Sequence, residues 1–199
     1  GRIVDYSTGG EVYQAVLDND VVRDIYDYCL KAGCGMVTYD GDRVITGTDI
    51  DGYMTFEASI NHMEIMRIDN FREYIDFPLN KCLLTADPDK AEKIEQELAE
   101  KFGDQLNIFR SEPYFVEIMP PNVHKATSLE KLLEVLDMDR KDLVACGDGY
   151  NDLTMIEYAG VGVAMANAQD IVKEHANYIT LSNDEDGLVP VVDKFILAD

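Results

Sequence analysis

Apolar residues recur with helical spacing in the last third of the chain, and this part gives the clearest structural prediction. Residues 125–136 place four leucines three, four and seven positions apart, which puts them on one face of a helix. The elements predicted after it are strands at 143–146, 161–165 and 178–181 and helices at 152–158, 169–176 and 187–197. Uncharged strands that alternate with helices indicate a parallel sheet covered on both faces.

A different pattern occupies residues 19–118. Helices are predicted at about 19–32, 52–64 and 88–102. The strand candidates between them come in pairs, at 35–39 with 43–46 across an Asp-Gly-Asp turn, and at 106–110 with 114–119 across Ser-Glu-Pro. Strands that pair with their neighbours along the chain predict hairpins, and therefore an antiparallel sheet within an α+β module.

The N-terminal segment predicts one more hairpin, with strands at 3–6 and 12–17 around a Ser-Thr-Gly-Gly turn. Pro120-Pro121 is the strongest candidate boundary on the C-terminal side. We therefore expect an α/β chain in three parts. These are residues 1–18, a hairpin that is a remnant of a core or linker, residues 19–118, the α+β module, and residues 119–199, part of a parallel-sheet core.

Composition limits the class of protein. The chain has 199 residues, of which 46% are apolar, which supports one large domain or two modest ones. This excludes disorder as the main state, and no uncharged apolar run approaches the roughly 18 residues of a membrane span. Seventeen Lys and Arg against 39 Asp and Glu give a net charge of −22. We expect no nucleic-acid or membrane partner, because each requires a basic face, and an anionic ligand would need a local positive charge.

The cysteines favour a reducing compartment. Cys29, Cys34, Cys82 and Cys146 form no C-x-x-C pair, and the three histidines show no zinc-ligand spacing. We expect four reduced and mostly buried thiols. The N-terminus has no basic segment followed by an apolar run, so both features favour a cytoplasmic protein.

Two charged features carry the candidate chemistry, namely Lys125 at a predicted helix start and the string Gly147-Asp148-Gly149-Tyr150-Asn151-Asp152. Asp148 follows a buried strand, at the carboxyl edge where parallel α/β sheets bind ligands. Asp148 and Asp152 would repel each other unless a cation lies beside them, and hard oxygen ligands suit Mg²⁺. Lys125 supplies a positive charge for a phosphate oxygen. The plain alternative stays open, because Gly-Asp-Gly is commonly a turn and an Asp before a helix is commonly its N-cap.

The order of several short motifs resembles the haloacid dehalogenase-like phosphohydrolases, in particular their Cof-type branch. The matching pieces are Val123-His124-Lys125-Ala126, Gly147-Asp148-Gly149-Tyr150-Asn151-Asp152-Leu153-Thr154-Met155, Ala159-Gly160-Val161-Gly162-Val163-Ala164-Met165, Asn167-Ala168 and Asn183-Asp184-Glu185-Asp186-Gly187. The family also inserts an α+β cap between two parts of a Rossmann-like core, and residues 19–118 have the size and pattern of that cap. Transport ATPases share the G-D-G-x-N-D element, but they need membrane spans.

This resemblance implies a Mg²⁺-dependent phosphatase and gives each residue an expected role. Asp148 would be a direct Mg²⁺ ligand, and Asp152 would support the metal site. Asn151 would bind the substrate phosphate, and Lys125 would hold both the phosphate and the carboxylate of the nucleophile. Lys125 and Asp148 are therefore the expected catalytic residues. The family more commonly has a small residue where His124 stands, and we expect His124 to be a solvated bystander.

The family's first motif, D-x-D-G-T after an apolar strand, carries its Asp nucleophile and its Asp acid/base. No string of this chain matches it. Asp49-Ile50-Asp51-Gly52 comes nearest, but Tyr53 stands in the place of Thr, and the residues before Asp49 make a poor buried strand. The string also lies inside the cap-like region. We interpret it as a turn and a helix N-cap.

We therefore expect the chain to be an inactive fragment of a phosphatase that acts on small phosphorylated metabolites through an aspartyl-phosphate. A parallel sheet that lacks its central strands would expose apolar edges, which leaves self-association open. The alternative is a non-catalytic module that binds phosphate esters or a metal through Lys125 and Asp148. A structural interaction subunit is the third hypothesis. The substrate itself does not follow from the sequence.

Overall fold

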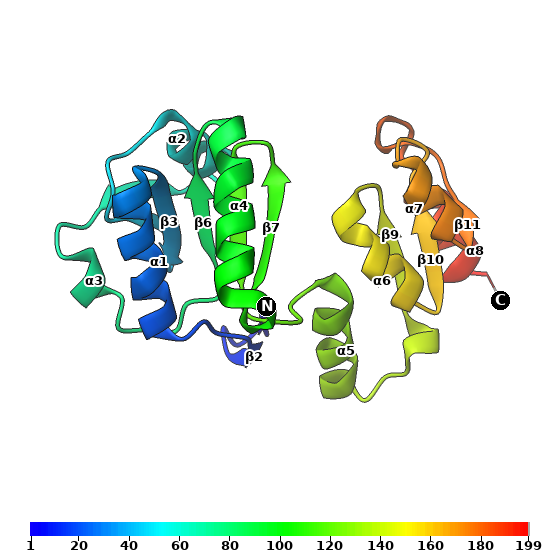
Figure 1. Ribbon diagram of the computed structural model, residues 1–199. Helices are drawn as coiled ribbons and strands as arrows, with labels where there is room; N and C mark the ends of the chain where they lie inside the picture. The colour runs from blue at the N-terminus through cyan, green and yellow to red at the C-terminus, as the bar shows by residue number, and fades with distance from the viewer. Residues whose placement is uncertain (199) are drawn as a thin grey trace. The chain divides into compact units, whose positions relative to one another are not determined.

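The computed structural model describes residues 1–198, which form two compact units (Figure 1). The first unit contains residues 1–2 and 14–123, and the second contains residues 3–13 and the described residues from 124 onward. Each unit has a sheet of its own. Residue 199, with which the last predicted segment ends, lies outside the described residues.

The first unit is built on a six-stranded sheet in the order β5-β4-β3-β6-β8-β7. Its strands are β3 (Gly35–Asp40), β4 (Arg43–Thr46), β5 (Glu64–Arg67), β6 (Cys82–Thr85), β7 (Asn107–Glu112) and β8 (Phe115–Met119). Both predicted hairpins are confirmed, since β3 pairs antiparallel with β4 and β7 with β8. At its β5 edge the sheet departs from the predicted antiparallel pattern, because β5 runs parallel to β4. Parallel neighbouring strands need a crossover connection, and the helix at Gly52–Ile60, between β4 and β5, supplies it.

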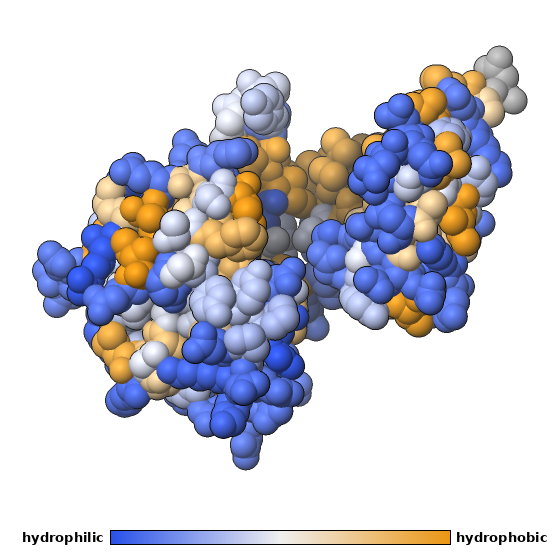
Figure 2. Space-filling view, turned by 90° about the horizontal axis from the view of Figure 1, so that it is seen from above, coloured by the Kyte–Doolittle hydropathy of each residue, from blue (hydrophilic) through white to orange (hydrophobic). Residues whose placement is uncertain are grey.

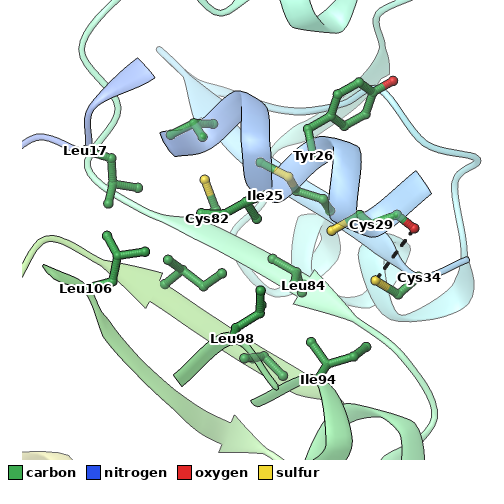
Figure 3. Close-up of a cluster of buried hydrophobic side chains, with 14 of the residues drawn as sticks. Leu17, Ile25, Tyr26, Cys29, Cys34, Cys82, Leu84, Ile94, Leu98 and Leu106 are labelled. Atoms are coloured by element: carbon green, nitrogen blue, oxygen red, sulfur yellow. Dashed lines mark hydrogen bonds between the residues drawn. The ribbon is translucent and has the colours of Figure 1, made fainter. Parts of the chain in front are cut away.

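Helices cover both faces of this sheet. They are α1 (Asn19–Ala32), α2 (Gly52–Ile60), α3 (Phe71–Tyr74) and α4 (Pro88–Phe102), followed by a 3-10 turn at Gly103–Gln105. Apolar side chains of α1 and α4, such as Ile25 and Leu98, form one core with β6 and β8 (Figure 3). Met54 and Ala58 of α2 pack with Val37 in a second, smaller core.

The helix ends follow from local chemistry. Asp18 caps α1 by accepting a hydrogen bond from the Asp20 N–H, and Gly33 ends the helix in the left-handed conformation. The boundaries of α1 therefore match the prediction. In contrast, α2 ends at Ile60 instead of the predicted residue 64. The chain turns at Asn61 and takes a left-handed conformation at His62, and residues from Glu64 onward then join the sheet as β5.

The second unit contains a three-stranded parallel sheet in the order β11-β10-β9, as the sequence predicts. Its strands are β9 (Val144–Gly147), β10 (Val161–Ala164) and β11 (Tyr178–Ile179), and its helices are α5 (Lys125–Leu136), α6 (Leu153–Tyr158), α7 (Asp170–His175) and α8 (Val189–Phe195). Short 3-10 turns lie at Arg140–Asp142, Tyr150–Asp152 and Asn183–Glu185. Ile156, Ala164 and Val172 form a small core between α6, β10 and α7. The α5 boundaries match the prediction, whereas α8 begins two residues later because a left-handed residue, Asp186, and a glycine precede it.

The remaining element is the predicted N-terminal hairpin, which forms with shorter strands, β1 (Arg2–Val4) and β2 (Glu11–Gln14). Its tight turn is closed by the Asp5 N–H, which donates to the Gly10 carbonyl at 2.9 Å. Hydrophilic residues cover much of the face shown in Figure 2, as the excess of acidic residues requires. Within residues 1–198, no helix has both the length and the apolar character needed to cross a bilayer.

Candidate functional site

The candidate site lies at the carboxyl edge of the parallel sheet in the second unit. Gly147 ends β9 in register with Ala164 of β10, so the residues that follow the two strands meet at the same edge. The Met165 N–H donates to the Gly147 carbonyl at 3.0 Å, and the Gln169 N–H donates to the Asp148 carbonyl at 2.9 Å. The loop at 165–169 is thereby fastened to the turn that carries Asp148.

Asp152 is the organising residue of this turn. The 3-10 turn Tyr150–Asp152 folds it back over the end of β9, where its side chain is 7% exposed. Its Oδ2 accepts hydrogen bonds from the backbone N–H groups of Asp148 and Gly149, at 2.9 and 3.1 Å. Its Oδ1 accepts from the Lys125 ammonium, with which it forms an ion pair. Both carboxylate oxygens are therefore held by donors of this chain.

The position of Asp152 requires a residue without a side chain at position 147. A Cβ atom on Gly147 would lie 2.4 Å from the Cβ of Asp152, and 2.7 Å from its carboxylate. Contacts this short force a displacement, and Asp152 has little freedom to move because three donors hold it. The first glycine of the string is therefore required by the close approach of Asp152, and not by an unusual backbone angle.

The environment of Asp152 also sets its ionisation. Burial by itself would raise its pKa, but the hydrogen bond from Lys125, the two backbone N–H groups and the lysine charge act in the opposite direction. The net result is a pKa below the ordinary value of 3.8. Asp152 is therefore an anion at neutral pH, and Lys125 is its partner.

Lys125 owes its position to a helix cap. It is the first residue of α5, and His124 is the N-cap. The His124 Nδ1 accepts a hydrogen bond from the Thr127 N–H at 3.3 Å, and the Thr127 hydroxyl group in turn accepts from the His124 N–H at 3.1 Å. His124 is exposed, as expected, but it is not a bystander, because it fixes the start of the helix that carries Lys125.

Asp148 and Asn151, the other two predicted site residues, are both exposed on the same turn. Asp148 Oδ2 accepts a hydrogen bond from the Asn167 side-chain amide at 3.2 Å. The structure therefore brings Lys125, Asp148 and Asp152 into one hydrogen-bonded network, with Asn151 on the turn at its surface. No role was expected of Asn167 from the sequence, although Asn167-Ala168 is one of the matching motif pieces. That piece, shortly after a buried strand, was the signal that could have identified it.

The other acidic string lies in the first unit and is used differently. Asp51 is the N-cap of α2, with its Oδ1 accepting from the Met54 N–H at 2.8 Å, so the predicted cap is confirmed. Its Oδ2 accepts from the Thr85 hydroxyl group. Asp49 is exposed and pairs with Arg67 at 3.3 Å.

The donor set of the site suits a hard cation, but it is incomplete as a closed metal site. No three His, Cys, Asp or Glu side chains gather into a metal-binding group anywhere in the described part of the chain. Mg²⁺ is commonly held by one or two carboxylates together with water and substrate phosphate oxygens. An exposed Asp148 carboxylate, oriented by Asn167 and next to the Lys125–Asp152 pair, fits such an open site.

Comparison with known proteins identifies the class. Residues 1–192 match the family described as haloacid dehalogenase-like hydrolase, and the chain belongs to this family. The resemblance stated from the sequence is thereby confirmed. A haloacid dehalogenase-like hydrolase from Bacteroides thetaiotaomicron has a similar crystal structure, with a TM-score of 0.92 and 42% sequence identity. That match covers 97% of this chain and 73% of the other.

Two of the curated proteins to which the chain is similar carry phosphatase names. YxeH of Bacillus subtilis, named as a phosphatase, is 29% identical over 204 residues, which are 100% of this chain and 74% of that protein. YcsE of the same organism, named 5-amino-6-(5-phospho-D-ribitylamino)uracil phosphatase, is 40% identical over 111 residues. This second match covers 56% of this chain and 44% of YcsE.

Proposed function

We propose that residues 1–199 are part of a Mg²⁺-dependent phosphatase of small phosphorylated metabolites and supply its metal- and phosphate-binding groups. The observation that carries this proposal is the network in which Lys125 and two backbone N–H groups hold Asp152 beneath Asp148. The network lies at the carboxyl edge of a parallel sheet. The chain belongs to a hydrolase family and is similar to two proteins that carry phosphatase names.

Each residue of the network has a distinct proposed role. Asp148 is the direct Mg²⁺ ligand, because its carboxylate is exposed. Asp152 supports the metal site indirectly, because its two oxygens already accept from Lys125 and from the turn. Lys125 is 47% exposed, which leaves its ammonium accessible to a phosphate oxygen, and Asn151 contributes an amide to the same ligand. When bound, Mg²⁺ would offset the charge of the phosphate group, which a chain of net charge −22 otherwise repels.

The proposed chemistry is hydrolysis through an aspartyl-phosphate. A carboxylate oxygen bonds to phosphorus while the ester oxygen leaves and takes a proton, and water then cleaves the acyl phosphate to give inorganic phosphate. Lys125 would orient both the phosphate and the attacking carboxylate. Residues 1–199 contain no D-x-D-G-T string, so the groups assigned in this chain bind and orient, and the nucleophile is not among them.

The parts of the chain have matching proposed roles. Residues 19–118 would act as the cap that selects the substrate, and residues 119–199 as part of the Rossmann-like core, with residues 1–18 as core remnant or linker. We place the protein in the cytoplasm, which agrees with its four free thiols. Three of them are buried, namely Cys29, Cys34 and Cys82. A second copy that covers exposed sheet edges is a further expectation, which sedimentation of the purified protein would test.

The proposal is tested by substituting Asp148→Ala in the full gene product that contains residues 1–199. Mg²⁺-dependent hydrolysis of p-nitrophenyl phosphate should disappear. Asp193→Ala is the matched control, since Asp193 is an exposed acid on α8 of the same unit, and it should leave the rate unchanged. Activity of Asp148→Ala within twofold of wild type would sink the assignment. A gene product that binds Mg²⁺ and phosphate through Asp148 but never turns over would favour the non-catalytic module.

A further inference from the structure

One side chain of the second unit, Asn167, lies between the candidate metal ligand and the turn before α8. Its Nδ2 donates to Asp148 Oδ2 at 3.2 Å. Its Oδ1 accepts from the Asn183 backbone N–H at 3.2 Å. A backbone N–H can only donate, so the Asn167 oxygen must face Asn183. This contact therefore fixes the amide orientation and directs the NH₂ group toward Asp148.

The loop that carries Asn167 follows β10 and is hydrogen-bonded to the end of β9 and to the segment after β11. The Met165 N–H is bonded to the end of β9, and the Gln169 N–H to the Asp148 carbonyl that follows it. The Ala166 N–H donates to the Leu181 carbonyl, beyond β11, at 3.2 Å. Asn167 stands in the middle of this loop, so its amide is presented to Asp148 by a fixed backbone.

An exposed carboxylate otherwise rotates freely, and ordering it costs conformational entropy when an ion binds. A hydrogen bond to one oxygen removes part of that cost in advance. Outer hydrogen bonds of this kind orient the ligands of metal sites. The contact to Oδ2 also distinguishes the two oxygens of Asp148, since it leaves Oδ1 as the oxygen without that donor.

We propose that Asn167 is a positioning residue, which holds Asp148 Oδ2 so that Oδ1 is presented to Mg²⁺. The inference rests on the proposed function, because it takes Asp148 as the metal ligand. It adds a residue from a different strand end, and it explains why the loop at 165–169 is bonded so closely to the turn of Asp148. Asn167 itself need not touch the ion or the phosphate.

The test uses protein of residues 1–199 and follows the amide resonances of Asp148 and Gly149 during titration with Mg²⁺ in the presence of inorganic phosphate. Asn167→Ala and Asn167→Leu remove the amide, and the leucine keeps the size of the side chain. We expect both to weaken Mg²⁺ binding by about tenfold. Asn183→Ala is the matched control, because Asn183 contributes its backbone N–H, and its affinity should stay within about twofold of wild type.

Asp148→Asn separates the inference from the function on which it rests. If Asp148→Asn abolishes the Mg²⁺ response while both Asn167 variants bind like wild type, the positioning role is overturned and the metal ligand stands. If Asp148→Asn binds like wild type, or wild type gives no response, both are overturned. A residue that positions a ligand is rescued by excess Mg²⁺. Asn167 variants that excess Mg²⁺ does not restore, and whose Gly149 amide is already displaced without metal, would assign Asn167 to the fold and overturn the proposal.

Discussion

Two stretches of this chain, Asp49–Gly52 and Gly147–Asp152, use the same residue types at similar places, between a strand and a helix, and yet they are built for different ends. In the first, Asp51 accepts from a helix N–H and from the Thr85 hydroxyl group, which are neutral donors. In the second, Asp152 accepts from the Lys125 ammonium and from the N–H groups of the turn itself.

The difference teaches that the partners of a carboxylate, more than its motif, mark a candidate site. Asp51 completes a cap through neutral donors, and Asp49, the exposed acid of the same string, forms a separate surface pair with Arg67. Asp152 anchors the turn on which Asp148 stands, and it brings a lysine to that turn. In a chain of net charge −22, a lysine fixed at a sheet edge is the kind of local charge that an anionic ligand requires.

The largest expected difference between the two strings is catalytic. Purified protein of residues 1–199 should give no Mg²⁺-dependent hydrolysis of p-nitrophenyl phosphate above that of buffer. Asp51 is engaged as a cap and Asp49 pairs with Arg67, so neither acid of the first string is placed as a nucleophile. Turnover that disappears in Asp49→Ala would reverse the comparison and make Asp49–Gly52 the catalytic string.

The glycines of the two strings should respond to alanine with opposite signs. Gly147→Ala places a Cβ 2.4 Å from the Cβ of Asp152 and should destabilise the second unit by about 2 kcal/mol. Gly52→Ala, in the first turn of α2, meets no atom within 4 Å and should stabilise the first unit by about 0.5 kcal/mol. Urea unfolding gives the free energies, and hydrogen exchange identifies the unit. Equal changes in unfolding free energy at the two positions would show that the two glycines do not differ in their steric role.

Lys125→Met tests the cation itself. It leaves a nearly buried carboxylate with its two backbone donors but without its charge partner, and we expect a loss of about 1.5 kcal/mol. The value lies below that of a fully buried pair, because Lys125 is 47% exposed and solvent screens it. Lys131→Met is the control on the same helix, since its pair with Glu134 is exposed, and its loss should be clearly smaller than that of Lys125→Met. Indistinguishable losses would mean that the Lys125 pair is an ordinary surface contact.

Thr85→Val tests the corresponding partner of Asp51. The valine removes the hydroxyl donor, while the Met54 N–H continues to cap α2, so the expected loss is about 1 kcal/mol. Mg²⁺ binding, followed by the amide resonance of Gly149, should be unchanged. A change in Mg²⁺ affinity would connect Asp51 to the metal site and contradict the division of roles.

Local signals predicted much of this structure. The helix at 125–136 has the predicted ends, because its leucine spacing and its cap are both local. β6 (Cys82–Thr85) was not among the named strands, because its four residues acquire their role from partners far away in sequence, β3 and β8. The parallel edge at β5 escaped prediction for the same reason. The hydrophobic period of a short stretch of sequence does not show which distant strand it pairs with.

The candidate site divides in the same way. Lys125, Asp148, Asn151 and Asp152 could be named from sequence, because strand ends and helix starts are visible there. The burial of Asp152 could not be predicted, because it depends on a 3-10 turn that folds the side chain back over β9. The contact of Asn167 could not be predicted either, since it depends on hydrogen bonds that fasten one loop to the ends of other strands.

The smallest expected effect is a dependence on pH that the second string should show. The pKa of Asp152 is lower in the folded chain than its ordinary value of 3.8, despite burial, because Lys125 and the turn N–H groups favour the anion. A group of this kind stabilises the fold above its unfolded pKa, and the stabilisation is lost as the pH falls through the folded pKa. The difference in unfolding free energy between wild type and Asp152→Asn should therefore be largest near neutral pH and shrink below 3.8.

Lys125→Met sharpens this last measurement. Without the lysine, the Asp152 anion loses one of the groups that favour it. The pH-dependent difference in unfolding free energy between Lys125→Met and the double variant Lys125→Met/Asp152→Asn should therefore be smaller than that between wild type and Asp152→Asn. Urea unfolding at a series of pH values gives both differences. If the first difference stayed constant from about pH 7 to about pH 2, the lysine and the turn would not distinguish the ionised carboxyl from the protonated one. The electrostatic contrast between Asp152 and Asp51 would then disappear, and only the steric contrast between their glycines would remain.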